Sequence, residues 1–252
     1  MISGEKDARL KVRMGAVDDV ALESIQRSFT KPEFVSFVKQ LKVIHGDLLR
    51  FYELQSLGLV AIQTATRIGT IPEHGIEGIR LRDINLERDP PIMSVWDKKT
   101  KRRPTGEWVK RLPPICFKAM KMYLARRYDT STETAAIKQV IKEHGEDKLF
   151  PEKYTIYVKL FREGLNAIGL IAIDRPFHSM RHAFVDWMIL TELGTNLLAI
   201  ATLGGWDNVD TMIEWYFGGT EALLDGWMNE ATGTAKREPI PFEKGLEELP
   251  LQ

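Results

Sequence analysis

The stretch Pro176-Phe177-His178-Ser179-Met180-Arg181-His182 constrains the fold of this chain more than any other. Its proline precedes an apolar repeat at helical spacing that ends at a glycine, which predicts a helix with a defined start and stop. The repeat consists of Phe184, Val185, Met188, Ile189 and Leu193, and the glycine is Gly194. His178 and Arg181 lie three residues apart and therefore share one helical face near the N-terminus. Because a helix N-terminus carries unpaired N–H groups and partial positive charge, these two side chains predict a site for an oxyanion such as a phosphate.

The other patterns predict a mainly helical protein with one small antiparallel β-hairpin or sheet. Thr30-Lys31-Pro32-Glu33 is a capping box with proline in the first turn, so a helix begins there. Further helices are predicted at 47–66, 113–127, 130–145, 152–165, 196–203, 209–217 and 220–231. Residues 92–96 and 108–112 are predicted strands with a turn near Gly106. The tail 238–252, which contains proline and glutamate, is predicted to be extended or disordered.

Basic residues gather in the predicted hairpin, although the whole chain has a net charge of zero. The basic residues are Lys98, Lys99, Lys101, Arg102, Arg103, Lys110 and Arg111, and the only acids among them are Asp97 and Glu107. A charge run of this kind is usually a solvated hairpin tip. An exposed basic hairpin can also enter a groove of DNA and place one lysine beside a phosphate. Net neutrality counts against nucleic-acid binding, but the distribution of charge matters more than its sum.

Further positions extend the pattern set by the helix that starts at Pro176. Arg67 lies at the end of the predicted helix 47–66, Trp206 follows Leu203-Gly204-Gly205, and Tyr216 lies near the end of the predicted helix 209–217. The order of Arg67, a hairpin lysine, His178-x-x-Arg181, Trp206 and Tyr216 resembles that of the tyrosine recombinases, which include phage and archaeal integrases, Xer recombinases and Cre. The resemblance covers about residues 30–218.

The resemblance implies the DNA breaking-rejoining fold of tyrosine recombinase catalytic domains. It also implies a site-specific recombinase or integrase that cleaves and rejoins DNA strands through a covalent 3′-phosphotyrosine intermediate. In that reaction Tyr216 would be the nucleophile, and Arg67 and Arg181 would clamp the phosphate. His178 would donate a hydrogen bond or act as a base for the phenol. Trp206 would pack against the site or donate its indole N–H to a phosphate oxygen.

The family takes a general acid from the hairpin, which favours Lys99 here, with Lys98 and Lys101 as rivals. Arg102 and Arg103 would add contacts to DNA. The reaction requires neither a metal nor a nucleotide, so no cofactor is implied.

The sequence departs from the family pattern at two places. The family often has a glutamate three residues after the first arginine, where this chain has Thr70. The acidic residue that would orient Arg67 is therefore open among Glu73, Glu77 and Asp83. In close relatives the tyrosine lies nine residues after the His or Trp, whereas Tyr216 lies ten residues after Trp206. A bulge would absorb the extra residue, or Trp206 is not the equivalent position.

The predicted domain organisation is a leader or linker at 1–27, a catalytic domain at 28–218, and a C-terminal helix and tail at 219–252. The resemblance implies double-stranded DNA attachment sites as partners and a homotetramer on DNA. It also implies C-terminal segments exchanged between protomers, for which the Leu223 and Trp227 face is the candidate contact. Recombinases of this family usually carry an N-terminal DNA-binding domain, and 1–27 is too short to form one.

Single residues and composition exclude several other classes. Cys116 is the only cysteine, so no intrachain disulfide forms, and a reducing cytoplasm with access to host DNA is expected. No apolar run approaches the length of a membrane span. His178 and His182 form an i,i+4 pair typical of half a zinc site, but no further Cys or His is placed to complete it. Two alternatives remain, a type IB topoisomerase-like strand passer and a DNA-binding module that has the fold without catalysis.

Overall fold

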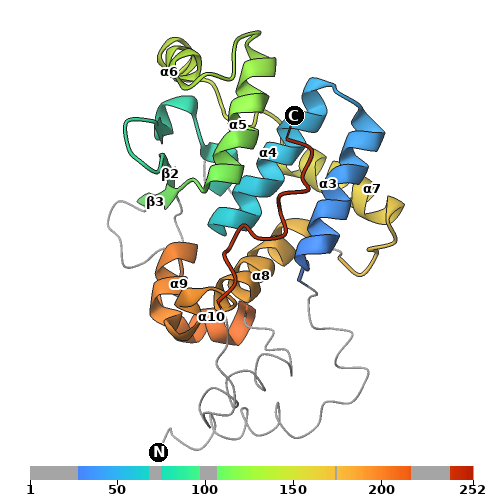
Figure 1. Ribbon diagram of the computed structural model, residues 1–252, viewed down its shortest axis with the longest axis vertical. Helices are drawn as coiled ribbons and strands as arrows, with labels where there is room; N and C mark the ends of the chain where they lie inside the picture. The colour runs from blue at the N-terminus through green and yellow to red at the C-terminus, as the bar shows by residue number, and fades with distance from the viewer. Residues whose placement is uncertain (1–27, 68–74, 97–106, 174, 217–238, 252) are drawn as a thin grey trace, which may run out of the picture.

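The computed structural model describes residues 28–67, 75–96, 107–173, 175–216 and 239–251, without the side chains of 194–195 and 214–216. It is mainly helical with a three-stranded antiparallel sheet, which confirms the coarse prediction from sequence (Figure 1). The helices are α3 (Lys31–His45), α4 (Leu49–Thr64), α5 (Pro114–Arg127), α6 (Thr134–Glu143), α7 (Tyr154–Ala167), α8 (Pro176–Ile189), α9 (Leu197–Gly204) and α10 (Val209–Tyr216). Short 3-10 turns lie at Gly75–Gly78, Leu81–Asp83 and Glu192–Thr195. In these residues no helix is both long enough and apolar enough to span a lipid bilayer.

Helix α4 is the centre of the fold. Its residues from Phe51 to Thr64 are all buried, including polar side chains such as Glu53, Gln55 and Gln63. It packs against α3, α5 and α8, and the predicted capping box at Thr30 and Glu33 does start α3. The end of α4 is therefore fixed from three sides, and it leads directly to Arg67.

The sheet covers one side of this helical body. Its order is β1 (Ile84–Asn85), β2 (Ile92–Trp96) and β3 (Glu107–Arg111), with antiparallel pairing throughout. Trp108 pairs with Val95 and Lys110 pairs with Met93, so all four side chains lie on the buried face. A lysine thus occupies an inward position in β3, where the alternation of the strand favours an apolar residue.

A smaller apolar cluster joins α8, α9 and α10 to the end of α4 (Figure 1). Phe184 and Met188 of α8, Ile200 of α9 and Met212 of α10 are buried in it, together with Ala65. The cluster holds the Gly204-Gly205 turn and Trp206 close to the end of α4.

Residues 239–251 pack against the body without forming a helix or strand, so of the predicted extended or disordered tail the disordered alternative is wrong for this segment. The tail runs beside α3, α4 and α5, and its leucines Leu246, Leu249 and Leu251 are buried (Figure 1). Its backbone accepts hydrogen bonds from the side chains of the helices, as in the 2.9 Å bond from Lys31 Nζ to the Lys244 carbonyl. The spacing of these leucines was hidden in sequence by the prolines and glutamates around them. The leader 1–27 and the predicted helix 220–231, with Leu223 and Trp227, lie outside the described residues.

Candidate active site

Two of the predicted site residues, Arg67 and Arg181, meet where α4 ends against α8. Arg181 is buried in the second turn of α8, and its Nη1 donates a hydrogen bond to the Ala65 carbonyl. Ala65 has a left-handed backbone (φ 50°) that ends α4, and the hydroxyls of Thr64 and Thr66 are 2.6 Å apart across this turn. A left-handed alanine costs about 1 kcal/mol, and burial of Ala65 together with the Arg181 bond offsets that cost.

The two arginines line one small cavity together with Lys110. We call this the cationic cavity, defined by Arg67, Lys110 and Arg181. Its other walls come from the end of α4, from β2 and β3 and from the Gly204-Gly205 turn. Elements far apart in sequence therefore place three cationic side chains around one space.

The Trp206 ring stacks on the Arg181 guanidinium. Its ring centroid is 4.1 Å from the Arg181 guanidinium carbon, so the indole covers one face of that group. Gly204 makes room for the ring, since a Cβ at this position would lie 1.7 Å from Trp206 Cζ3. Gly205 ends α9 in the left-handed region at φ 79°. Of the two predicted roles for Trp206, packing against the site is the one that this geometry supports.

Lys110 is the site residue that sequence reasoning missed. Its Nζ donates a 2.7 Å hydrogen bond to the Leu203 carbonyl and lies 5.5 Å from the centre of the Trp108 ring. The sequence placed Lys110 only in the basic run of the hairpin. Its period-2 alignment with Trp108, on the face that pairs with Met93 and Val95, was the available signal that it points inward.

The predicted lysines are not described by the structure. Lys98, Lys99, Lys101, Arg102 and Arg103 lie between β2 and β3 and outside the described residues. Their assignment as general acid and DNA contacts stays a prediction.

His178 begins the same helix as Arg181 but does not line the cationic cavity. Its ring packs edge-on against His182, with the two ring centroids 4.8 Å apart. His182 is buried, as expected for a structural histidine. The cationic cavity thus lies further along the helix, at Arg181, and the oxyanion site expected at the N-terminus of α8 stays a prediction. Within the described ranges no group of three or more His, Cys, Asp or Glu side chains could hold a metal ion.

Tyr216 is the last residue of α10, and α10 packs against α8 and α9. This places its backbone in the same part of the fold as Trp206 and Arg181, while its side chain lies outside the described residues. The ten-residue step from Trp206 to Tyr216 consists of a short loop and the whole of α10.

Two of the three acids considered as partners of Arg67 form local hydrogen bonds. Glu77 Oε1 accepts a 3.2 Å bond from the backbone N–H of Tyr154 at the start of α7. Asp83 Oδ2 accepts a 2.8 Å bond from the backbone N–H of Arg80. Glu73 lies outside the described residues.

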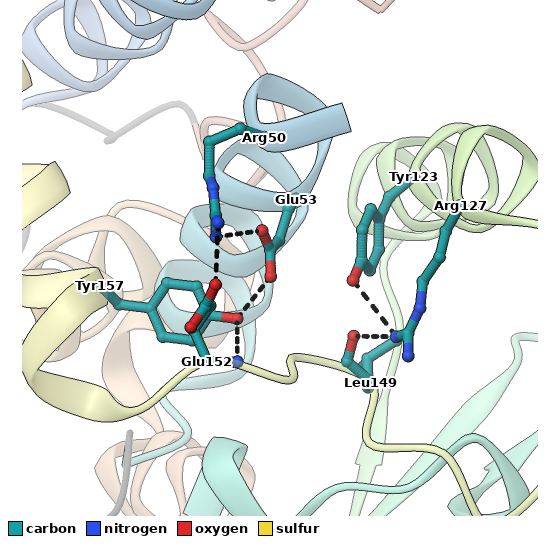
Figure 2. A network of polar contacts seen from close by, with 7 residues as sticks. All are labelled: Arg50, Glu53, Tyr123, Arg127, Leu149, Glu152 and Tyr157. Carbon is teal, nitrogen blue, oxygen red and sulfur yellow. Dashed lines mark hydrogen bonds and ion pairs between the residues drawn. The ribbon is translucent and has the colours of Figure 1, made fainter. Parts of the chain in front are cut away.

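A second polar cluster lies away from this cavity, between α4 and the start of α7 (Figure 2). Arg50 donates to Glu53 at 2.7 Å and to Glu152 at 2.8 Å. The Tyr157 hydroxyl donates to Glu53 at 2.6 Å and accepts from the Glu152 N–H at 3.1 Å. Burial raises the pKa of Glu53, while the Tyr157 hydrogen bond and the Arg50 charge oppose that change. We call this group the Glu53 network.

Comparison of the chain with models of protein families, with curated proteins and with solved structures finds no match.

Proposed function

We propose that this chain is the catalytic part of a tyrosine-type, site-specific DNA recombinase or integrase. The observation that carries the proposal is the cationic cavity, in which Arg67 and Arg181 come together with Lys110 beside the Gly204-Gly205 turn. Two guanidiniums at one site can bind the non-bridging oxygens of a phosphodiester and stabilise the charge of a pentavalent transition state. The order of Arg67, a hairpin lysine, His178-x-x-Arg181, Trp206 and Tyr216 along the chain also resembles that of the tyrosine recombinases.

The proposed reaction is a reversible transesterification. The Tyr216 oxygen attacks the phosphorus and forms a phosphotyrosine ester at the 3′ side, while the bond from phosphorus to the 5′ oxygen breaks. The phenol proton leaves to a base, for which His178 is the candidate, and the 5′ oxygen takes a proton from a lysine, for which Lys99 is the candidate. A 5′ hydroxyl from another strand then attacks the phosphotyrosine and releases Tyr216. No external energy source is required, since the ester conserves the energy of the broken bond.

Trp206 acts in this scheme through Arg181. The indole covers one face of the guanidinium and keeps water from it, so Arg181 presents its edge to the phosphate. Double-stranded attachment sites and a homotetramer on DNA belong to the same proposal, and so do DNA contacts from Lys98, Lys101, Arg102 and Arg103.

The test is covalent capture of DNA. A pool of nicked duplexes with randomised sequence around the nick is incubated with the protein, because a nick lets the cleaved fragment diffuse away and traps the adduct. Wild type is expected to give a protein band shifted by covalent DNA on a denaturing gel. Tyr216→Phe is expected to give none, because phenylalanine has no nucleophilic oxygen. Tyr154→Phe on α7 is the matched control and should react as wild type does.

Two outcomes contradict the proposal. An adduct with Tyr216→Phe at the wild-type level would assign the nucleophile elsewhere. A wild-type protein that binds the pool but forms no adduct would be a DNA-binding module without cleavage. Relaxation of supercoiled plasmid without strand exchange would instead favour the topoisomerase-like alternative, which uses the same chemistry.

A further inference from the structure

Lys110 makes contacts that differ from those of a surface lysine. The residue is only 5% exposed, and its stem rises from the inward face of β3. Its Nζ reaches the Leu203 carbonyl at 2.7 Å. That carbonyl belongs to the last turn of α9, where the carbonyls point outward and carry partial negative charge. A cation at a helix C-terminus is stabilised there and in turn fixes the end of the helix.

The end of α9 determines where Trp206 lies. Leu203 is followed by Gly204 and Gly205, and a Cβ on Gly205 would be 3.0 Å from the Lys110 Nζ. The lysine and the turn are therefore packed as closely as a glycine allows. The chain then reverses, with the Trp206 N–H donating to the Ala201 carbonyl at 2.9 Å, and the indole comes to lie on Arg181.

We propose that Lys110 is a positioning residue that holds the Gly204-Gly205 turn, so that Trp206 supports Arg181 in the geometry needed for phosphate. The role within the reaction rests on the proposed function, but the connection from Lys110 through the Gly204-Gly205 turn to Trp206 and Arg181 does not. This assignment separates Lys110 from the hairpin lysines. They would give a proton to the leaving oxygen, whereas Lys110 acts through the protein.

The first test is independent of DNA chemistry. The chain has six tryptophans, so a nitrogen-15 NMR spectrum contains few indole N–H signals. The signal that disappears in Trp206→Phe is the one from Trp206. Lys110→Met keeps a straight apolar side chain against Trp108 but removes the charge. We expect the Trp206 signal to move in Lys110→Met, as will that of Trp108, which Lys110 contacts directly. An unmoved Trp206 signal would overturn the positioning role, whatever the protein does to DNA.

Lys121→Met is the matched control. Lys121 also lies over an aromatic ring, at 5.2 Å from the centre of Phe117, but on α5 and away from the cavity. The same loss of a lysine charge there should leave the Trp206 signal in place. A Trp206 signal that moves equally in both variants would indicate a general effect of charge and would overturn the assignment.

The second test separates positioning from proton donation. The single-turnover rate of adduct formation is measured with an ordinary nicked duplex and with one whose leaving 5′ oxygen is replaced by sulfur. A thiolate leaves without needing a proton, so the sulfur substrate rescues the loss of a general acid. Misplacement of a binding group by about 1 Å can cost 10²-fold in rate, so we expect a loss of that order in Lys110→Met on both substrates. Rescue of Lys110→Met by sulfur would make Lys110 the proton donor and overturn the positioning role.

The two tests distinguish failure of the proposed function from failure of the role of Lys110. If wild type forms no adduct on either substrate, the proposed function fails while the spectrum still decides whether Lys110 positions Trp206. If wild type reacts and Lys110→Met reacts equally fast, the proposed function stands and the role of Lys110 in it is overturned.

Discussion

The Glu53 network and the cationic cavity both hold arginines in polar surroundings, but their partners differ. In the Glu53 network, Arg50 is placed between two carboxylates. In the cationic cavity, Arg181 donates to a backbone carbonyl and stacks on an indole, and Lys110 likewise donates to a carbonyl beside a tryptophan ring. Carboxylates neutralise an arginine, whereas carbonyls and rings orient a cation and leave its charge in place. Under the proposed function, the first cluster stabilises the fold and the second binds the phosphate of DNA.

The largest expected effect comes from replacing one arginine by glutamine in each of the two regions. Arg181→Gln should lower the single-turnover rate of adduct formation by about 10²–10³-fold, because a charged donor to the transition state is lost. Arg50→Gln should leave that rate near the wild-type value and lower the free energy of unfolding instead, because Glu53 stays buried with a weaker partner. For both variants, the rate of adduct formation is measured on denaturing gels and the free energy of unfolding by urea titration.

Two results would contradict this comparison. An Arg50→Gln variant that is stable but slow would place the Glu53 network in the reaction. An Arg181→Gln variant that reacts normally and merely unfolds more easily would make Arg181 a structural residue. Arg181→Lys sharpens the assignment, since it keeps the charge but loses the planar group that stacks on Trp206.

A smaller effect is expected from one hydroxyl group in the Glu53 network. Tyr157→Phe removes the donor to Glu53 and the acceptor of the Glu152 N–H, so a buried carboxylate and a half-buried N–H lose a partner. The free energy of unfolding should fall by about 2 kcal/mol, measured by urea titration. The rate of adduct formation per folded molecule should not change. Tyr154→Phe on the same helix is the control, and an equal loss of stability in both variants would contradict a specific role of the network.

These two regions also show what sequence reasoning can reach. The helices were predictable where periodicity and caps agree, as in the capping box at Thr30 and the proline that starts α8. Arg67 and Arg181 were predictable as a pair only through their order along the chain, because nothing local in α4 indicates that its end meets α8. The Glu53 network was not predicted, since a Glu and a Tyr on separate helices carry no signal of mutual contact.

Sequence reasoning missed two further features, each for a physical reason. Lys110 is inward-facing in β3, and a lysine within a basic run normally indicates solvent. Its burial depends on the carbonyl at the end of α9, which is remote in sequence. The tail 239–251 has a polar composition, and the contribution of its leucines to the core is visible only once the chain has folded against α3 and α4.

The smallest predicted effect concerns a buried carboxylate whose surroundings contrast with those of Glu53. Asp186 on α8 accepts a 2.5 Å hydrogen bond from the Ser28 hydroxyl, and burial raises its pKa to about 6 although that bond opposes the change. The folded state therefore binds a proton more tightly than the unfolded state. The resulting stabilisation is complete below the unfolded pKa of 3.8 and is lost as the pH rises through about 6.

Asp186→Asn should consequently be more stable than wild type at pH 8, where the wild-type carboxylate is charged and buried. The shift in pKa alone would be worth about 3 kcal/mol, but a buried amide with one good partner offsets much of this, which leaves about 1 kcal/mol. Urea titrations at pH 8 and pH 4 test the sign, because the advantage of Asp186→Asn should disappear at the lower pH. An advantage that stays constant with pH would mean that Asp186 does not titrate in this range. Glu53→Gln should show no such gain at pH 8, since Arg50 already stabilises the charge of Glu53.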